Sequence, residues 1–98
     1  MKAIDIDEEA LEEIAEAAAY YDGERAGLGA EFRSELAAAL ERLGRFPLMY
    51  AVTRRRLRAC PMGRFPYTLH YIDLPDRIWI AAVAHQSRRP GYWKGRKP

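Results

Sequence analysis

Residues 28–44 read LGAEFRSELAAALERLG and carry the strongest structural pattern in the chain. Leucine or phenylalanine recurs there at steps of three and four, which places one apolar stripe along a helix. The stripe consists of Leu28, Phe32, Leu36, Leu40 and Leu43. Gly44 follows the last of them, and glycine commonly ends a helix. We therefore predict an amphipathic helix that packs its stripe against another part of the protein.

A second amphipathic helix is predicted over residues 8–21, with Leu11, Ile14, Ala18 and Tyr21 on one stripe. Asp7 is placed to cap its start, and Asp22-Gly23 to end it. The connector 23–29 contains three glycines, so the two helices should form an antiparallel hairpin. The residues predicted to pack the hairpin are Leu11, Ile14, Tyr21, Phe32, Leu36 and Leu40.

Strand patterns flank the hairpin on both sides. The predicted strands cover residues 2–6, 55–62, 65–73 and 78–84. The last is apolar on both faces, as expected of a central strand. Pro61 lacks an N–H group for the ladder, which predicts a bulge or a sheet edge. The expected fold is α+β: a short N-terminal strand, an antiparallel helical hairpin and three antiparallel strands, with the helices packed on the sheet. We expect one domain over residues 1–98.

Charge is divided unevenly along the chain. Residues 1–49 contain 5 Lys and Arg against 12 Asp and Glu, a balance of 5 − 12 = −7. Residues 50–98 contain 11 against 2, a balance of 11 − 2 = +9, and the two sums give the net charge of +2. The basic half is the expected contact surface for an acidic partner. The alternative is that the two halves neutralise each other across the fold.

The sequence favours a cytoplasmic protein. No stretch reaches the roughly 20 apolar residues that span a bilayer, and the first residues are acidic where a signal peptide is basic. Cys60 is the one cysteine, so no internal disulfide is possible. No cofactor and no metal ion are predicted.

The order of one strand, two helices and three strands resembles the RelE/ParE superfamily of toxins, and several motifs support the resemblance. These are Ala19-Tyr20-Tyr21 with Gly27-Leu28-Gly29 and Phe32, then Arg58, then Arg64-Phe65-Pro66-Tyr67 with Tyr71, and finally Ala82-Val83-Ala84-His85-Gln86 with Arg88, Pro90, Tyr92 and Trp93. The last motif is similar to a His-x-x-Arg-x-Pro-x-Tyr-Trp ending of many ParE-like members. The motifs occur in the family's order along nearly the whole chain.

This resemblance implies a toxin that a co-produced antitoxin neutralises. Members similar to ParE poison DNA gyrase, whereas members similar to RelE cut messenger RNA in the ribosomal A site, so the fold alone leaves the target open. RelE-like nucleases rely on clustered lysines and arginines with a tyrosine near the C-terminus. This chain has no lysine between Lys2 and Lys94, and its ending matches the ParE-like pattern.

Arginines at the start of the second predicted strand, residues 55–62, are candidates for binding a target or the antitoxin. Arg54, Arg56 and Arg58 would share one face if that strand begins early, and could clamp phosphates or meet a carboxylate-rich surface. The alternative is a solvated strand edge whose charges prevent aggregation. Arg58 matches a family position, which favours a functional role for it.

His85 ends the last predicted strand, on the face expected to carry Trp79 and Val83. Its imidazole could act as a general acid or base. A structural role is favoured instead, in which His85 holds the C-terminal segment by hydrogen bonds. No partner histidine or carboxylate lies near it in sequence, which argues against a metal site.

The segment after Gln86 mixes cations with aromatic rings, a composition suited to phosphate contact and base stacking. Its members are Arg88, Arg89, Tyr92, Trp93, Lys94, Arg96 and Lys97. The alternative is that Trp93 folds back over the core. Pro90, Gly91 and Pro98 argue against a helix, so we expect an extended tail anchored by Tyr92 and Trp93.

Three functions follow from these observations. The first is a non-enzymatic gyrase inhibitor that uses the basic half to bind its target; the candidate residues for binding the target or antitoxin are Arg54, Arg56, Arg58, Arg64, Arg88, Tyr92 and Trp93. The second is a ribosome-dependent nuclease, in which Arg58, Arg64 and Arg88 would stabilise the phosphorane while His85 or Tyr92 moves protons. The third is an inactive member that serves as a binding module.

Overall fold

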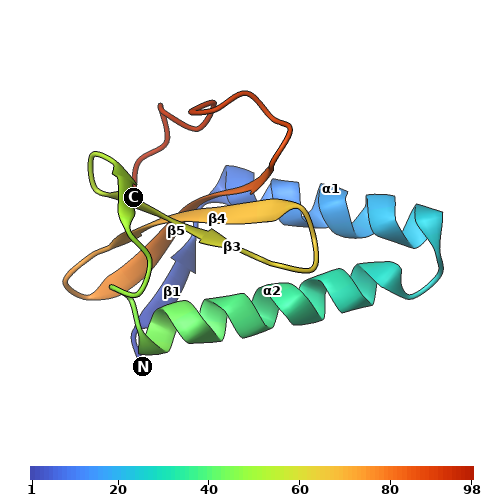
Figure 1. The fold of residues 1–98 in the computed structure, drawn as a ribbon, viewed down its shortest axis with the longest axis horizontal. Coiled ribbons are helices and arrows are strands. Elements are labelled where there is room, and N and C mark those ends of the chain that lie inside the picture. Colours follow the sequence, from blue (N-terminus) through green and yellow to red (C-terminus); the bar gives the residue numbers. More distant parts are fainter.

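The computed structural model describes residues 1–98 as a five-stranded sheet with two helices packed on it (Figure 1). The elements in chain order are β1 Ala3–Ile6, α1 Glu8–Glu24, α2 Leu28–Arg45, β2 Val52–Arg54, β3 Leu57–Pro61, β4 Tyr67–Asp73 and β5 Arg77–His85. The predicted α+β fold is confirmed. The structure adds one short strand, β2, to those predicted. No helix is long and apolar enough to cross a membrane.

The strands lie in the order β1-β5-β4-β3-β2, so β5 is central, as its apolar pattern predicted. β1 runs parallel to β5, whereas all other neighbours are antiparallel. The main core lies between the hairpin and one face of the sheet. Its largest fully buried side chains include Tyr71, Phe32, Leu43 and Leu69. A second, smaller cluster around Trp79 belongs to the opposite face.

The helical hairpin is confirmed, with α1 extending three residues beyond the predicted end at Tyr21. Asp7 caps α1 as expected, since its carboxylate accepts a hydrogen bond from the Glu9 N–H at 3.0 Å. At the far end, Asp22 accepts from the Gly29 N–H at 2.8 Å. A Cβ atom at position 29 would collide with the Ala18 carbonyl, so glycine there allows the helices to approach closely.

The predicted packing face of α1 is wrong at one position, because Leu11 is 49% exposed. The buried residues of this helix are Ala10, Ile14, Ala17 and Ala18. The helix therefore turns a narrow alanine-rich surface toward the sheet and places Leu11 beside it. Small residues carry this contact because they let the backbone lie close to β5.

The strand predicted over residues 55–62 begins later than expected. Arg54 ends β2, and Arg55 and Arg56 form the turn to β3, with Arg55 in the left-handed region at φ 52°. Arg54, Arg56 and Arg58 therefore do not share one strand face, which corrects that prediction. The expectation for Pro61 holds, because β2 pairs only with residues 57 and 58 and leaves the Pro61 end of β3 at the sheet edge.

A bulge in β5 corrects the prediction that His85, Trp79 and Val83 share one face of the strand. His70 pairs with Ala82 whereas Tyr71 pairs with Ile80, so Ala81 is an extra residue in the ladder. The alternation of side chains shifts there. Trp79 consequently belongs to the smaller cluster, whereas Val83 belongs to the main core on the helix side.

The C-terminal tail, residues 86–98, folds back over the sheet instead of extending, which corrects the prediction for this segment. Short turns shape it, including a hydrogen bond from the Lys94 N–H to the Gly91 carbonyl at 3.1 Å. Trp93 packs on the smaller cluster, as the alternative interpretation had it. The chain then ends beside the turn between β2 and β3 (Figure 1).

Candidate functional site

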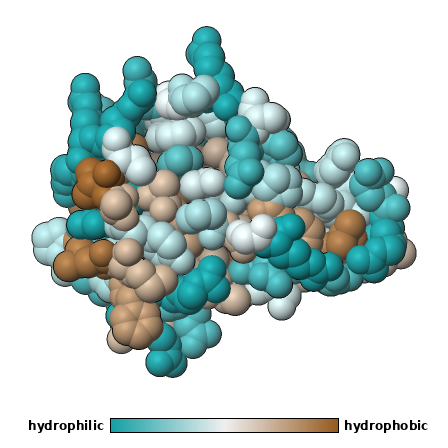
Figure 2. All heavy atoms as spheres, in the orientation of Figure 1, coloured by the Kyte–Doolittle hydropathy of each residue, from teal (hydrophilic) through white to brown (hydrophobic).

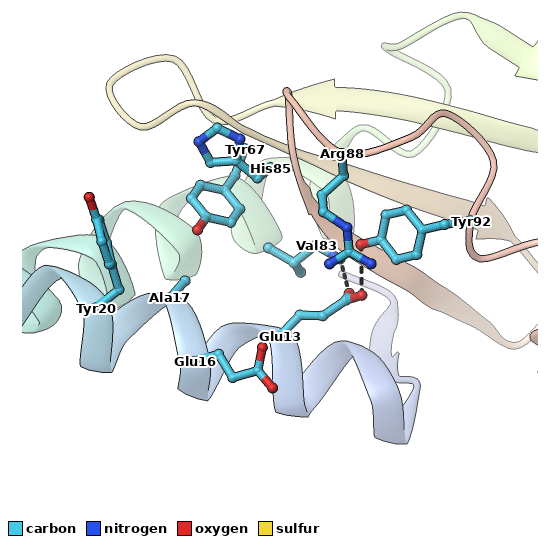
Figure 3. Close-up of a pocket in the computed structure, with 9 residues that line it drawn as sticks. All are labelled: Glu13, Glu16, Ala17, Tyr20, Tyr67, Val83, His85, Arg88 and Tyr92. Atoms are coloured by element: carbon cyan, nitrogen blue, oxygen red, sulfur yellow. Dashed lines mark hydrogen bonds between the residues drawn. The ribbon is translucent and has the colours of Figure 1, made fainter.

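A cleft of about 280 Å³ opens between α1, the end of β5 and the tail. It brings together three of the candidate residues, His85, Arg88 and Tyr92, as Figure 3 shows. The other residues that line it are Glu13, Glu16, Ala17, Tyr20, Tyr67 and Val83. α1 supplies one wall of the cleft, and the tail turns back so that Arg88 and Tyr92 form the other.

Glu13 lies at the back of this cleft and joins α1, β5 and the tail. Its side chain is only 12% exposed. One carboxylate oxygen accepts from the Val83 N–H at 3.0 Å, and the other accepts from the Tyr92 hydroxyl at 2.6 Å. The charge is balanced by Arg96, whose guanidinium lies 3.0 Å from Glu13 and also donates to the Ala81 carbonyl at 2.9 Å. Burying a carboxylate is costly unless it is paired and hydrogen-bonded in this way.

Arg96 has three acidic neighbours on or next to α1, which are Asp7, Glu9 and Glu13. Only 10% of its side chain is exposed. One cation of the basic half is therefore neutralised by the acidic half, as the second interpretation of the charge division proposed. The tail is tied to the start of α1 by this contact.

Tyr92 is held in its protonated form. Burial and the hydrogen bond to Glu13 raise the pKa of its hydroxyl far above the ordinary value. The Arg88 guanidinium lies over the same ring, 3.9 Å from its centre, in a cation–π contact. Tyr92 is thus a fixed donor and anchor within the cleft.

His85 contacts the first residues of the tail. Its Nδ1 accepts from the Ser87 N–H at 3.0 Å, and the Ser87 hydroxyl lies 2.7 Å from the same nitrogen. Its ring stands edge-on to Tyr67 at 5.1 Å between centres. These contacts are of the kind expected for a histidine that holds the C-terminal segment.

The remaining candidates lie away from this cleft. Arg58, on β3, donates to the Tyr50 carbonyl at 2.7 Å and so holds the loop after α2. Arg64, in the turn before β4, pairs with Glu31 on α2. The five residues proposed for nuclease chemistry therefore occupy three separate places.

Reasoning from sequence missed Glu13, Arg96 and His70. Glu13 lies three residues after Ala10 and four before Ala17, so a carboxylate within the buried stripe of α1 was a readable signal. Arg96 was noted only as one of the cations in the segment after Gln86, with no partner predicted for it. His70 faces the tail, where its ring stacks on Trp93 at 3.9 Å between centres, and its pairing could not be read from the strand pattern.

Comparison with known families assigns the chain. A family model described as the ParE toxin of the type II toxin-antitoxin system, parDE, matches residues 4–90. The protein belongs to this toxin family. The match covers both helices and, except for Ala3, all five strands, and membership implies an antitoxin partner. A search of curated proteins finds no match to this ParE-family chain.

Proposed function

We propose that this ParE-family protein inhibits DNA gyrase in the cytoplasm without catalysing a reaction, and that a cognate antitoxin neutralises it. Family membership supports the toxin role, and the basic second half supplies a surface for an acidic partner. Growth arrest would follow from the blocked gyrase. No cofactor is needed for such binding.

One observation favours inhibition over RNA cleavage. A nuclease of this fold would need cations and proton-transfer groups around one phosphate. Here Arg58 and Arg64 lie apart from the cleft, and the Tyr92 hydroxyl already donates to Glu13. The raised pKa of Tyr92 also makes it a poor general base near neutral pH.

Residues 46–52, which are the loop between α2 and β2 and the first residue of β2, form the surface we propose for anchoring the antitoxin. Its exposed apolar residues are Phe46 at 59%, Leu48 at 65%, Met49 at 53% and Val52 at 48%. Figure 2 shows hydrophobic residues gathered on this side of the molecule, around the end of α2. Arg54 follows directly at the exposed edge strand β2. An antitoxin segment with apolar and acidic residues would satisfy both features.

A supercoiling assay tests the gyrase proposal. Purified toxin should block ATP-dependent supercoiling of relaxed plasmid and lead to accumulation of cleaved DNA, and prior addition of the antitoxin should prevent both. The assignment would be rejected if supercoiling stays intact at a large molar excess of toxin while cells that express the toxin still stop growing. Codon-positioned cuts in translated messages, detected by primer extension, would establish the nuclease instead. Expression without harm in the absence of antitoxin would indicate an inactive member.

A further inference from the structure

A groove on the face of the sheet opposite the helices has an apolar floor and a basic rim. Its volume is about 240 Å³. The floor consists of Leu57, Ile72, Trp79, Ala81 and Trp93, and the rim of Arg55, Arg56, Lys94, Arg96 and Lys97, with Pro98 at the end. No aspartate or glutamate side chain lines the groove. A ligand that fits it must therefore carry negative charge next to an apolar or flat group.

Four cations of this rim are available to a ligand. Arg96 is neutralised by Glu13, whereas Arg55, Arg56, Lys94 and Lys97 are exposed and form no ion pair within the chain. They come from two segments about 40 residues apart, the β2–β3 turn and the tail. Figure 2 shows hydrophilic side chains projecting on the side where these segments meet.

The two sides of the groove, the β2–β3 turn and the tail, meet next to each other. The Arg54 guanidinium lies beside Gly91 of the tail. Arg55 adopts a left-handed backbone conformation that few residues other than glycine accept, so the turn has a defined and strained shape. The backbone that carries Arg55 and Arg56 thus has a defined shape before a ligand arrives, which reduces the backbone entropy lost on binding.

Trp93 gives the floor a flat ring that is already fixed. It stacks on His70 with an angle of 24° between the rings, and it also lines the groove. A nucleobase can pack against aromatic side chains while arginines and lysines contact the phosphates on either side. The hollow has room for one such ring, whereas an amphipathic peptide helix needs a continuous apolar groove for anchors over two turns.

We propose that this groove binds a single strand of nucleic acid, with its phosphates between Arg55, Arg56, Lys94 and Lys97 and one base against the floor. Direct strand binding requires no gyrase, so the proposal goes beyond the inhibition argued above. Both DNA and RNA carry the phosphodiester and base that the groove recognises. Comparing DNA with RNA in the same assay identifies which of the two the groove prefers.

Fluorescence anisotropy with labelled oligothymidylate of about twelve nucleotides tests the proposal. Four phosphate contacts predict a slope of about −3 for log K against log salt, since each contact on a single strand contributes about −0.7. The affinity should therefore fall about fifty-fold between 50 and 200 mM salt. Oligouridylate is the RNA arm, and a duplex of the same length should bind more weakly than either.

Variants assign the binding to this groove. Arg55→Asn with Lys94→Gln removes one cation from each side, and asparagine tolerates the backbone at position 55. This pair should reduce the salt slope to about half. Arg33→Gln with Arg89→Gln removes the same charge from exposed, unpaired arginines outside the groove and should leave the slope nearly unchanged. Trp93→Phe, checked for folding by circular dichroism, should lower the affinity several-fold without changing the slope.

The outcomes separate this proposal from its alternatives. Equal losses in the groove and control pairs would mean that only net charge matters and would overturn it. Preferential binding of a polyglutamate peptide, with no binding of either oligonucleotide, would assign the groove to an acidic protein segment. Gyrase inhibition is measured separately, so blocked supercoiling without strand binding would reject this inference alone.

Discussion

The Tyr92 hydroxyl donates a hydrogen bond of 2.6 Å to Glu13, a residue 79 positions earlier in the sequence. This contact, with the ion pair between Glu13 and Arg96, connects the tail to α1. The Val83 N–H donates to the same carboxylate, so β5 shares the connection. The walls of the cleft in Figure 3 therefore depend on one acidic side chain.

Replacing Glu13 should destabilise the protein and release the tail. Glu13→Gln leaves Arg96 without its nearest counter-charge and weakens or removes the four hydrogen bonds that the carboxylate accepts from Val83, Tyr92 and Arg96, which should cost about 2–4 kcal/mol of unfolding free energy. Urea denaturation measures the loss, and proteolysis should cut the tail first. Glu12→Gln changes an exposed neighbour that forms no hydrogen bond or ion pair; it is the matched control and should change stability by under about 0.5 kcal/mol. Equal stability of the two variants would refute the role given to Glu13.

Leucines on the two helices should differ sharply in their contribution to stability. Leu36 is 5% exposed in the main core, so Leu36→Ala should cost about 2–5 kcal/mol. Leu11 is 49% exposed, and Leu11→Ala should cost well under about 1 kcal/mol. Chemical denaturation of both variants provides the comparison. A loss below 1 kcal/mol for Leu36→Ala would contradict the assigned core.

The stacking of His70 on Trp93 should make stability depend on pH. Burial lowers the pKa of His70 to about 4, and only a weaker effect of Glu13 opposes this. As the pH falls, the unfolded chain therefore takes up the proton first, near the ordinary value of 6.5. The stability from neutral His70 is fully present above pH 6.5 and is lost between about 6.5 and 4.

His70→Phe keeps a flat ring against Trp93 and removes the titration. The unfolding free energy of the wild type should fall relative to this variant by about 1–2 kcal/mol between pH 7 and pH 4, after allowance for the partial exposure of the imidazole. Urea denaturation at several pH values measures the unfolding free energy of both proteins. Taking the difference between them removes the contribution of the carboxylates, which titrate in both. Parallel curves of unfolding free energy against pH for the two proteins would mean that His70 takes up its proton at the same pH in the folded and the unfolded chain, which would contradict the prediction.

Most of the fold could be predicted from the sequence because its signals are local. The spacing of Leu28 to Leu43, the cap at Asp7 and the apolar run of β5 each depend on neighbours within a few residues. The errors arise where long-range contacts decide. Leu11 resembles a core leucine, but packing against β5 selects the alanines beside it. The bulge at Ala81 likewise results from pairing with β4 and moves Trp79 and Val83 to opposite faces.

The candidate site was predicted only in part. His85, Arg88 and Tyr92 do converge, because the sequence places them within eight residues after a strand. Glu13, which accepts the hydrogen bond from Tyr92, lies 79 residues earlier in the sequence, and only the folded chain brings it to the cleft. Arg58 and Arg64 looked similar to these residues in sequence, but nearby contacts with the Tyr50 carbonyl and with Glu31 hold them elsewhere.

The last prediction concerns the antitoxin, whose binding should be steered by charge and held by apolar contact. Arg54→Glu with Arg56→Glu reverses two cations beside the exposed loop 46–52. Long-range attraction acts mainly on encounter and is screened over about 8 Å at physiological salt. The association rate should therefore fall about tenfold at low salt and lose much of its salt dependence, with a smaller change in dissociation. Leu48→Ser with Met49→Ser should instead accelerate dissociation, because these exposed side chains would be buried in the complex.

Stopped-flow mixing with the cognate antitoxin, over a salt series, measures both rates. Arg33→Glu with Arg89→Glu makes the same change in net charge at exposed arginines outside residues 46–56 and should reduce association much less, because local potential matters more than total charge. The two effects are separable because charge acts before contact and apolar burial after it. If the association rate changes neither with salt nor with the charge reversal at Arg54 and Arg56, the basic half does not steer the antitoxin. If dissociation is unchanged in the serine variant, the anchor lies elsewhere, and the seam between the hairpin and the sheet becomes the surface to probe next.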